Sequence, residues 1–298
     1  MAGLNQEIWN SRLERDEWFA NNAFLQDAVN MDAFVEYNKI NFAQRGAVIT
    51  VEKNGAYPIP APSQRTDVAG GATLDEYRTN QIVVTDAEQV ELAYSKLDSI
   101  VDEAKEKLED KIASEALHEV APNAATTKTP IIAVDAGNAA GDDGFKVMTT
   151  NDILKLKKSW DLLNYPKKGR VLVLNPDAII ALIQDTVLKE QYMRQPAGTI
   201  SGAVLNIYGF EIYERTYDLY YTAANAKVAY GTAAGGTDNK ACNAYIRNQT
   251  FLRALGTVKM YDDVDNPAYQ GTVMSWRKRA KVAPFFQQYM GAIVRTKV

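Results

Sequence analysis

The chain has 298 residues, enough to bury a sizeable core in one large or two moderate domains. Its composition, with 46% hydrophobic and 23% charged residues, is that of a folded globular protein. The formal net charge of −4 argues against a free nucleic-acid binder or a membrane-surface protein. No window approaches 18 consecutive apolar residues, which argues against a transmembrane helix.

The chain has one cysteine and one histidine, which limits the disulfides, metal sites and catalytic mechanisms that it can have. Cys242 alone excludes intrachain disulfides and thiolate metal clusters, and we expect a small, semi-buried side chain in a loop-like stretch. His118 lies near the end of a predicted helix, where a structural role is expected rather than catalysis. The N-terminal stretch lacks the apolar core of a signal peptide, so we expect synthesis in a cytosol without export by that route.

The first part of the chain reads as an arm followed by a long hairpin. Residues 1–43 are helical or irregular with scattered aromatics, which can pack on a core or reach onto a neighbour. Residues 47–86 have strand-like ends at 48–52 and 81–85 around a middle rich in glycine, proline and polar residues. A two-stranded hairpin of this length projects roughly 50 Å. Because an isolated hairpin is only marginally stable in water, we expect it to be ordered by packing on another surface.

A very long amphipathic helix is predicted from Asp86 to about Glu119, roughly 50 Å. It carries 11 acids against 4 lysines. A helix lying across a sheet and a coiled-coil strand both fit it, and the narrow stripe with small residues favours the sheet. Its apolar positions are spaced by three and four: Val90, Tyr94, Leu97, Val101, Ala104, Leu108 and Ile112.

An α/β unit follows. A short strand is predicted at 130–134, then a helix capped by Thr149 and Thr150 that ends at Tyr165-Pro166. The strand Val171 to Leu174 leads through Asn175 as cap and Pro176 into a helix. Residues 202–216 give two strand segments hinged near Gly209.

The last segment alternates as strands with a turn at residues 265–267. From Gln270 onward there are 6 basic residues and no acid. Charge blocks of this kind are typical of solvated faces or subunit contacts, and a nucleic-acid surface is the less favoured interpretation.

None of the candidate motifs completes a catalytic or ligand site. The turn at 175–177 has no glycine, and Pro176 removes an N–H that a pyrophosphate would need. The loop 231–240 lacks the Gly-Lys-Ser/Thr ending of a phosphate loop, and 135–144 lacks the spacing of a calcium loop, which leaves at most a weak surface cation site. The carboxylates Asp262 and Asp263 are expected in an exposed turn. We therefore expect no enzyme: no catalytic residue, no cofactor and no metal.

The order of parts is itself informative. The chain begins with the arm, the polar hairpin and the long helix. These are followed by the stretches RVLVLNPDAIIALIQD and GAVLNIYGFEIYERT, and then by the tail from FLRALGTVKMYDD to MGAIV. This order resembles the major capsid protein of tailed bacteriophages, the Hong Kong 97-type fold that encapsulin shells share. The resemblance covers nearly the whole chain and rests on architecture and short phrases.

The resemblance implies an α+β fold with five parts. These are an N-terminal arm (1–46), an extended β-hairpin loop (47–85), a peripheral domain with a long spine helix (86–148), an axial α/β domain (149–247) and return strands of the peripheral domain (248–298).

The resemblance also implies a function. Subunits would form pentamers and hexamers of an icosahedral virion shell around double-stranded DNA, without sequence specificity and without a membrane, assembled in the host bacterial cytoplasm. Portal, scaffold and decoration proteins are candidate partners; any scaffold is expected to be separate. The acidic helix and the basic tail are hypothesised to meet between subunits. The expected assembly contacts are Lys53, Asn54, Tyr57, Arg65, Arg78, Arg277, Lys278 and Arg279.

Cross-linking between subunits through Lys53, the one lysine in 47–86, is not expected, because no acidic helper is evident. Three alternatives remain open. The chain could form an encapsulin-type compartment, since one fold can serve unrelated tasks. A small α/β enzyme using carboxylates would leave 47–86 unexplained. A fibrous or adhesive surface protein would need an export signal.

Overall fold

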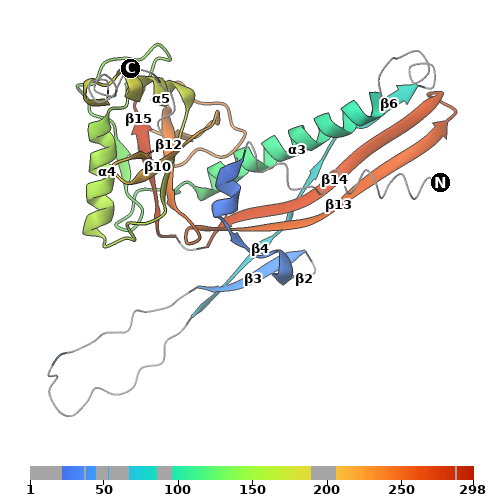
Figure 1. Ribbon diagram of the computed structural model, residues 1–298, viewed down its shortest axis with the longest axis horizontal. Helices are drawn as coiled ribbons and strands as arrows, with labels where there is room; N and C mark the ends of the chain where they lie inside the picture. Colours follow the sequence, from blue (N-terminus) through green and yellow to red (C-terminus); the bar gives the residue numbers. More distant parts are fainter. Residues whose placement is uncertain are drawn as a thin grey trace, which may run out of the picture.

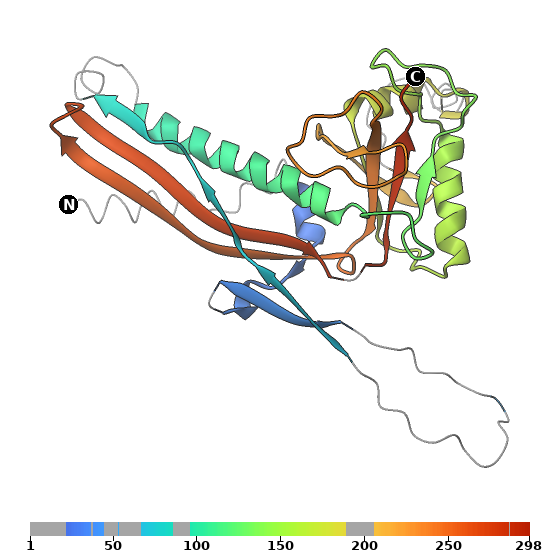
Figure 2. The same ribbon diagram turned by 180° about the vertical axis from the view of Figure 1, so that it is seen from behind.

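The computed structural model describes residues 22–36, 38–44, 53, 67–85, 96–188, 206–285 and 287–298. These residues form an α/β lobe and an elongated lobe, and a narrow two-stranded extension leaves the elongated lobe (Figures 1 and 2). The two lobes share one hydrophobic cluster, so the described parts pack as one body. Within the described residues, no helix has both the length and the apolar character needed to cross a membrane.

The α/β lobe is a seven-stranded mixed sheet with the order β7-β15-β12-β8-β10-β9, and β11 also pairs with β12. Helix α4 (Thr150–Leu162) packs against β7 and β15. Helix α5 (Pro176–Gln184) follows β8 directly. The strands are β7 (Ile131–Ala133), β8 (Arg170–Leu174), β9 (Asn206–Ile207), β10 (Phe210–Glu214), β11 (Tyr220–Tyr221), β12 (Asn239–Ile246) and β15 (Met290–Arg295).

The predicted helix starts and the Gly209 hinge are confirmed, with one difference. Thr149 and Asp152 form a capping box at α4, and Gly209 has φ +87 between β9 and β10. Asn175 stands before α5 as predicted, but its side chain does not cap the helix. Its amide nitrogen, in the orientation that fits its neighbours, donates to the carbonyl oxygens of Arg215 and Tyr217, which competes with capping.

The elongated lobe is a five-stranded sheet, β1-β13-β14-β5, with β6 also on β14. Gly271 opens β14 where a Cβ would overlap the carbonyl oxygen of Val84, so a side chain there would separate β6 from β14. The turn predicted at 265–267 lies slightly later, at residues 267–270 between the two longest strands, and Asp262 and Asp263 stand in β13 rather than in a turn. The elements are β1 (Val29–Asn30), β5 (Asp75–Arg78), β6 (Ile82–Thr85), β13 (Phe251–Asn266) and β14 (Gly271–Pro284).

Helix α3 (Lys96–Val120) lies along β14. Its stripe of Val101, Ala104 and Leu108 packs on Met274 and Trp276, because alternate residues of β14 face the helix. The prediction of a helix across a sheet is confirmed and the coiled coil is excluded. The helix ends as predicted near Glu119; the predicted start at 86–95 lies outside the described residues.

The predicted hairpin strands are in part wrong. The antiparallel pair is β3 (Lys39–Gln44) with β4 (Val68–Thr73), and β2 (Val35–Glu36) continues this sheet. The predicted strand at 81–85 exists as β6, but it pairs with β14 because Val84 is buried under α3. The predicted strand 48–52 lies outside the described residues.

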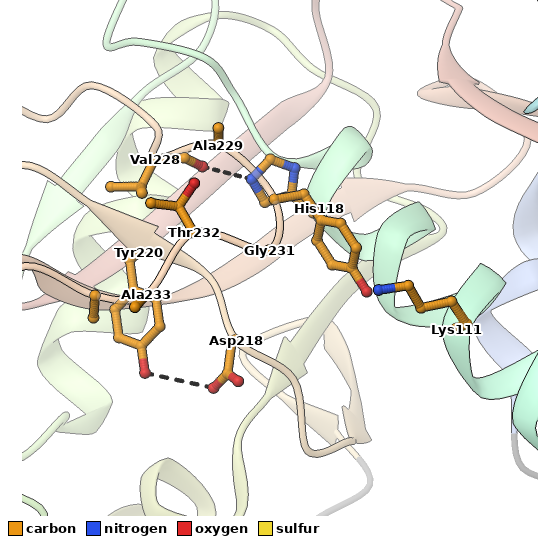
Figure 3. A pocket seen from close by; sticks show the side chains of 11 residues that line it. Lys111, His118, Asp218, Tyr220, Val228, Ala229, Gly231, Thr232 and Ala233 are labelled. Atoms are coloured by element: carbon orange, nitrogen blue, oxygen red, sulfur yellow. Dashed lines mark hydrogen bonds between the residues drawn. The ribbon is translucent and has the colours of Figure 1, made fainter.

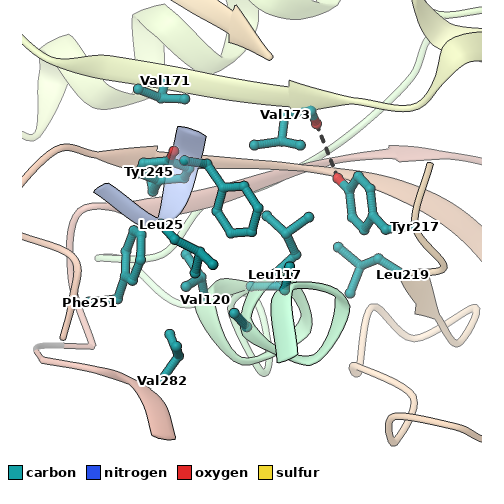
Figure 4. Packing of buried hydrophobic residues seen from close by; sticks show 14 of the residues in the cluster. Leu25, Leu117, Val120, Val171, Val173, Tyr217, Leu219, Tyr245, Phe251 and Val282 are labelled. Atoms are coloured by element: carbon teal, nitrogen blue, oxygen red, sulfur yellow. Dashed lines mark hydrogen bonds between the residues drawn. The ribbon is translucent and has the colours of Figure 1, made fainter. Parts of the chain in front are cut away.

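Residues 22–34, which precede β2, pack on the core, which is one of the two roles expected for the aromatic residues of the first 43 positions. They contain two short 3₁₀ turns, η2 (Ala23–Asp27) and η3 (Asp32–Phe34). Phe24 and Leu25 join the cluster that the two lobes share, where α3 meets the sheet through Leu117 and Val120 (Figure 4).

Asp27 fixes this segment to the α/β lobe. Tyr245 Oη donates to Asp27 Oδ2 over 2.8 Å, and Arg247 Nε lies 2.7 Å from Oδ1. Burial raises the pKa of Asp27, and the Tyr245 and Arg247 bonds oppose that rise.

Two further expectations are corrected. Cys242 lies in the middle of β12 and is fully buried, because β12 has strands on both sides; it is not in a loop. The MGAIV tail was expected to return with β13 and β14, but as β15 it pairs with β12 and β7 in the α/β lobe. All six residues of β15 are buried, which suits a central strand.

Candidate assembly surfaces

Four of the six basic residues of the tail, Arg277, Arg279, Lys281 and Arg295, form ion pairs inside the chain. Arg277 and Arg279 lie 3.6 and 3.4 Å from Glu76 Oε2, and Lys281 lies 2.7 Å from Asp75 Oδ2. These acids stand on β5, directly beside β14. The acidic partner of the tail is therefore β5 of the same chain, which the sequence patterning missed. A contact between the tail and the acidic helix of a neighbour stays a prediction.

The other expected contact residues are dispersed. Arg78 is exposed at the end of β5 and pairs with Glu76, which lowers the pKa of that carboxyl. Lys278 is buried on β14, so it offers little surface to a partner. Lys53 is exposed. Asn54, Tyr57 and Arg65 lie outside the described residues.

Strand β13 offers an open edge. Strand β1 covers it only at Leu252 and Arg253, and beyond that point no described strand pairs with this edge. Asp32 Oδ1 accepts from the backbone N–H of Leu255 over 2.6 Å, which satisfies one edge donor. An open edge presents unpaired N–H and C=O groups to another chain. Three large apolar side chains are exposed toward the tip: Tyr261, Val264 and Tyr269.

The pocket beside His118 has a volume of about 380 Å³ and is lined by residues of α3 and the 218–234 segment (Figure 3). His118 Nε2 donates to the carbonyl oxygen of Val228 over 2.7 Å. Lys111 Nζ lies 4.6 Å from the centre of the Tyr230 ring, and Tyr220 Oη donates weakly to Asp218 over 3.5 Å. His118 is thus committed to a backbone contact that ties α3 to the loop, and Cys242 is buried elsewhere in β12.

We expect His118 to make the folded chain less stable in mild acid. Burial lowers its pKa below the ordinary 6.5 and outweighs the opposing bond to Val228. Below pH 6.5 the unfolded chain therefore binds a proton that the folded chain binds only at lower pH, and the free energy of unfolding falls as the pH falls.

Because the chain has 1 histidine, a proton NMR titration reads this pKa directly, and a midpoint below 6.5 is expected. His118→Gln keeps an N–H donor but cannot titrate, so its urea midpoint should lose this part of the pH dependence. A titration midpoint above 6.5 would contradict the burial argument.

The loop 135–144 forms no cation site. Asp143 makes a bidentate pair with Arg295, with Oδ2 to Nη1 at 2.7 Å and Oδ1 to Nη2 at 2.9 Å. Asp135 lies 2.5 Å from Lys155 Nζ. Among the residues that the structure describes, no group of three His, Cys, Asp or Glu side chains could hold a metal ion. Two of the three carboxylates of this loop, those of Asp135 and Asp143, serve ion pairs of the fold.

No family model and no curated protein matches the sequence, whereas solved structures match along nearly all of it. The mature capsid of bacteriophage PhiM1 aligns with a TM-score of 0.65 and 9% identity, over 91% of this chain and 86% of that chain. The capsid of cyanophage P-SCSP1u gives 0.65 and 15%, over 92% and 88%. A virus-like particle from Pyrococcus furiosus gives 0.56 and 10%, over 97% and 99%.

At these identities the likeness is one of fold, and it includes both lobes. The aligned length is 91% and 92% of this chain for the first two of these structures, which is more than either lobe alone contains. The chain therefore has the α+β, Hong Kong 97-type fold of tailed-phage capsid proteins.

Proposed function

We propose that this chain is the major capsid subunit of a tailed bacteriophage, which self-assembles into the pentamers and hexamers of an icosahedral shell. The observation that carries the proposal is the fold shared with phage capsid proteins along nearly the whole chain. The elongated lobe supports it, because the open β13 edge and the exposed apolar side chains near its tip are features that another chain can pair with and cover.

The role is structural rather than catalytic. The shell encloses double-stranded DNA without reading its sequence, and the subunit belongs to the virion after assembly in the host bacterial cytoplasm. Portal, scaffold and decoration proteins are its candidate partners. In support, the one histidine donates through Nε2 to a backbone carbonyl and the one cysteine is buried in a central strand, which fits structural roles for both.

Sedimentation velocity of the expressed chain, followed by negative-stain microscopy, tests the proposal. Closed shells, or rings with five-fold and six-fold symmetry, are the expected result. A compact monomer at every concentration, in which protease also spares residues 45–66, would contradict it, because those residues would then need no neighbour.

The same preparation separates the phage head from an encapsulin-type compartment. One fold can serve unrelated tasks, so fold alone does not decide between them. A phage head should be large and, in infected cells, filled with DNA. A small shell that retains a co-expressed enzyme would instead identify a compartment.

A further inference from the structure

The α/β lobe carries opposite charge at its two ends. Its parallel strands β8 and β10 run in register from Arg170 and Phe210 at one end to Leu174 and Glu214 at the other. The antiparallel strand β12 runs back, and its Ile246 stands beside Arg170. Sheet register alone therefore assigns flanking side chains to one end or the other.

The Arg170 end is basic, and we call it the basic end. Asp161 fixes the last turn of α4 there by pairing with Arg170 at 2.8 Å, and Tyr165 Oη donates to the Lys128 carbonyl oxygen over 2.6 Å. Within the described residues, the lysines around this point form no ion pair. They are Lys128, Lys157, Lys158, Lys167 and Lys168, all exposed except the half-buried Lys157.

The Leu174 end is acidic, and we call it the acidic end. Asp142 and Asp177 line a shallow pocket of about 200 Å³ with Ile180. Asp177 pairs with Lys240 at 3.0 Å. In the described part of the chain, the carboxylates at this end without an ion pair outnumber the cations without one. The carboxylates are Asp142, Asp185, Glu214, Asp218 and Asp238; the cations are Lys146 and Lys297.

Each end also has an exposed apolar centre. Leu162 is 75% exposed at the end of α4, one turn after Lys158. Ile180 is 56% exposed on α5, one turn after Asp177. An apolar centre with a charged rim is the usual anatomy of a protein–protein interface. A nucleic-acid surface would need the lysines but not Leu162.

We propose that the basic end of one copy, centred on Leu162, docks on the acidic end of the next copy, centred on Ile180. Two like ends would repel, so a symmetric contact is disfavoured, whereas the head-to-tail contact pairs opposite charges. Head-to-tail contacts close into rings when the rotation allows. The inference rests on the proposed function and names the contact that would join α/β lobes around a capsid ring.

Charge reversal tests this contact. In the first variant, Lys158→Glu with Lys167→Glu makes the basic end acidic. In the second, Asp142→Lys with Asp177→Lys makes the acidic end basic. Each variant alone then brings like charges together, and we expect association about tenfold weaker or more at about 0.1 M salt. At about 1 M salt the screening length falls to about 3 Å and the defect should shrink. Lys107→Glu, on the exposed side of α3, is the control for a lysine-to-glutamate charge reversal outside both ends.

Mixing the two variants is the decisive experiment. The reversed basic end of the first fits the reversed acidic end of the second, and the two unchanged ends also fit, so the mixture should assemble. Because the two variants must alternate around a ring, the mixture should form even-numbered rings and not odd-numbered ones. Recovery on mixing also shows that each variant is folded.

Other outcomes of these experiments would overturn the proposed contact or the proposed function. If both variants assemble alone as the wild type does, the contact is wrong. If assembly is normal and only the nucleic acid content of the particles falls, the lysines face nucleic acid and the contact is again wrong. Two variants that fail alone and fail together also overturn it. A wild-type chain that forms no ring or shell contradicts the proposed function itself.

Discussion

We expect Asp143→Ala to lower the free energy of unfolding by about 3–5 kcal/mol, because the substitution leaves a buried guanidinium without its counter-ion. Arg295 is 1% exposed at the end of β15, and both oxygens of Asp143 accept from it. Its remaining bond, from Nε to the Lys146 carbonyl oxygen, does not neutralise the charge.

The neighbouring Asp142 is the matched control. Asp142 is exposed and belongs to the same loop, so Asp142→Ala should change subunit stability by no more than about 0.5 kcal/mol. Urea unfolding of both variants measures the difference. Equal losses for the two would show that the 135–144 loop, rather than the Arg295 pair, is what the substitutions disturb.

Trp160→Ala is expected to be as costly, about 3–5 kcal/mol, through the loss of a large side chain from a closed core. Trp160 is fully buried on α4. Its ring lies 5.3 Å from Phe210 on β10 and 6.2 Å from Tyr165, measured between ring centres. The side chain therefore joins the helix, the loop after it and the sheet.

Leu162→Ala, two residues further along α4, separates this loss from other effects of the helix. Because Leu162 is exposed, its removal should leave subunit stability within about 0.5 kcal/mol of the wild type. The urea midpoints of the two variants are the measurement. The shared cluster also predicts one unfolding transition, so two separate transitions in Trp160→Ala would mean that the lobes are less coupled than their packing indicates.

Local sequence patterns predicted the elements whose burial they encode. Strand β8 is a continuous apolar run and is buried on both faces, and α4 and α5 begin at the residues that the capping and proline signals indicated. The spacing of apolar residues in α3 predicted a helix on a sheet for the same reason: the apolar stripe of the helix packs on the buried side chains of the sheet. The order of these elements along the chain was enough to indicate the fold.

Local sequence patterns did not predict which strands pair when the strands are far apart in the chain. Strand β6 has the apolar, β-branched pattern of a strand, but that pattern does not identify the partner strand; its pairing with β14 goes with the burial of Val84 under α3. The tail strand β15 has the apolar run of any central strand, so its pattern does not choose between the two sheets. Cys242 is flanked by small and polar residues, Ala241 and Asn243, yet it occupies a central strand.

For the candidate surfaces too, the sequence shows which charged residues are present, and the structure shows where they lie. The lysines around α4 and the carboxylates of the 135–144 loop are visible in the sequence, but sheet register decides that they stand at opposite ends of one lobe. The basic tail was equally visible, and only strand pairing revealed that two carboxylates of β5 pair with three of its cations. The sequence by itself determined the helices, the buried strands, their order and the absence of a complete catalytic motif, because those follow from neighbouring residues. The tertiary structure decided which strands pair and which charges face outward, because both depend on contacts between residues far apart in the chain.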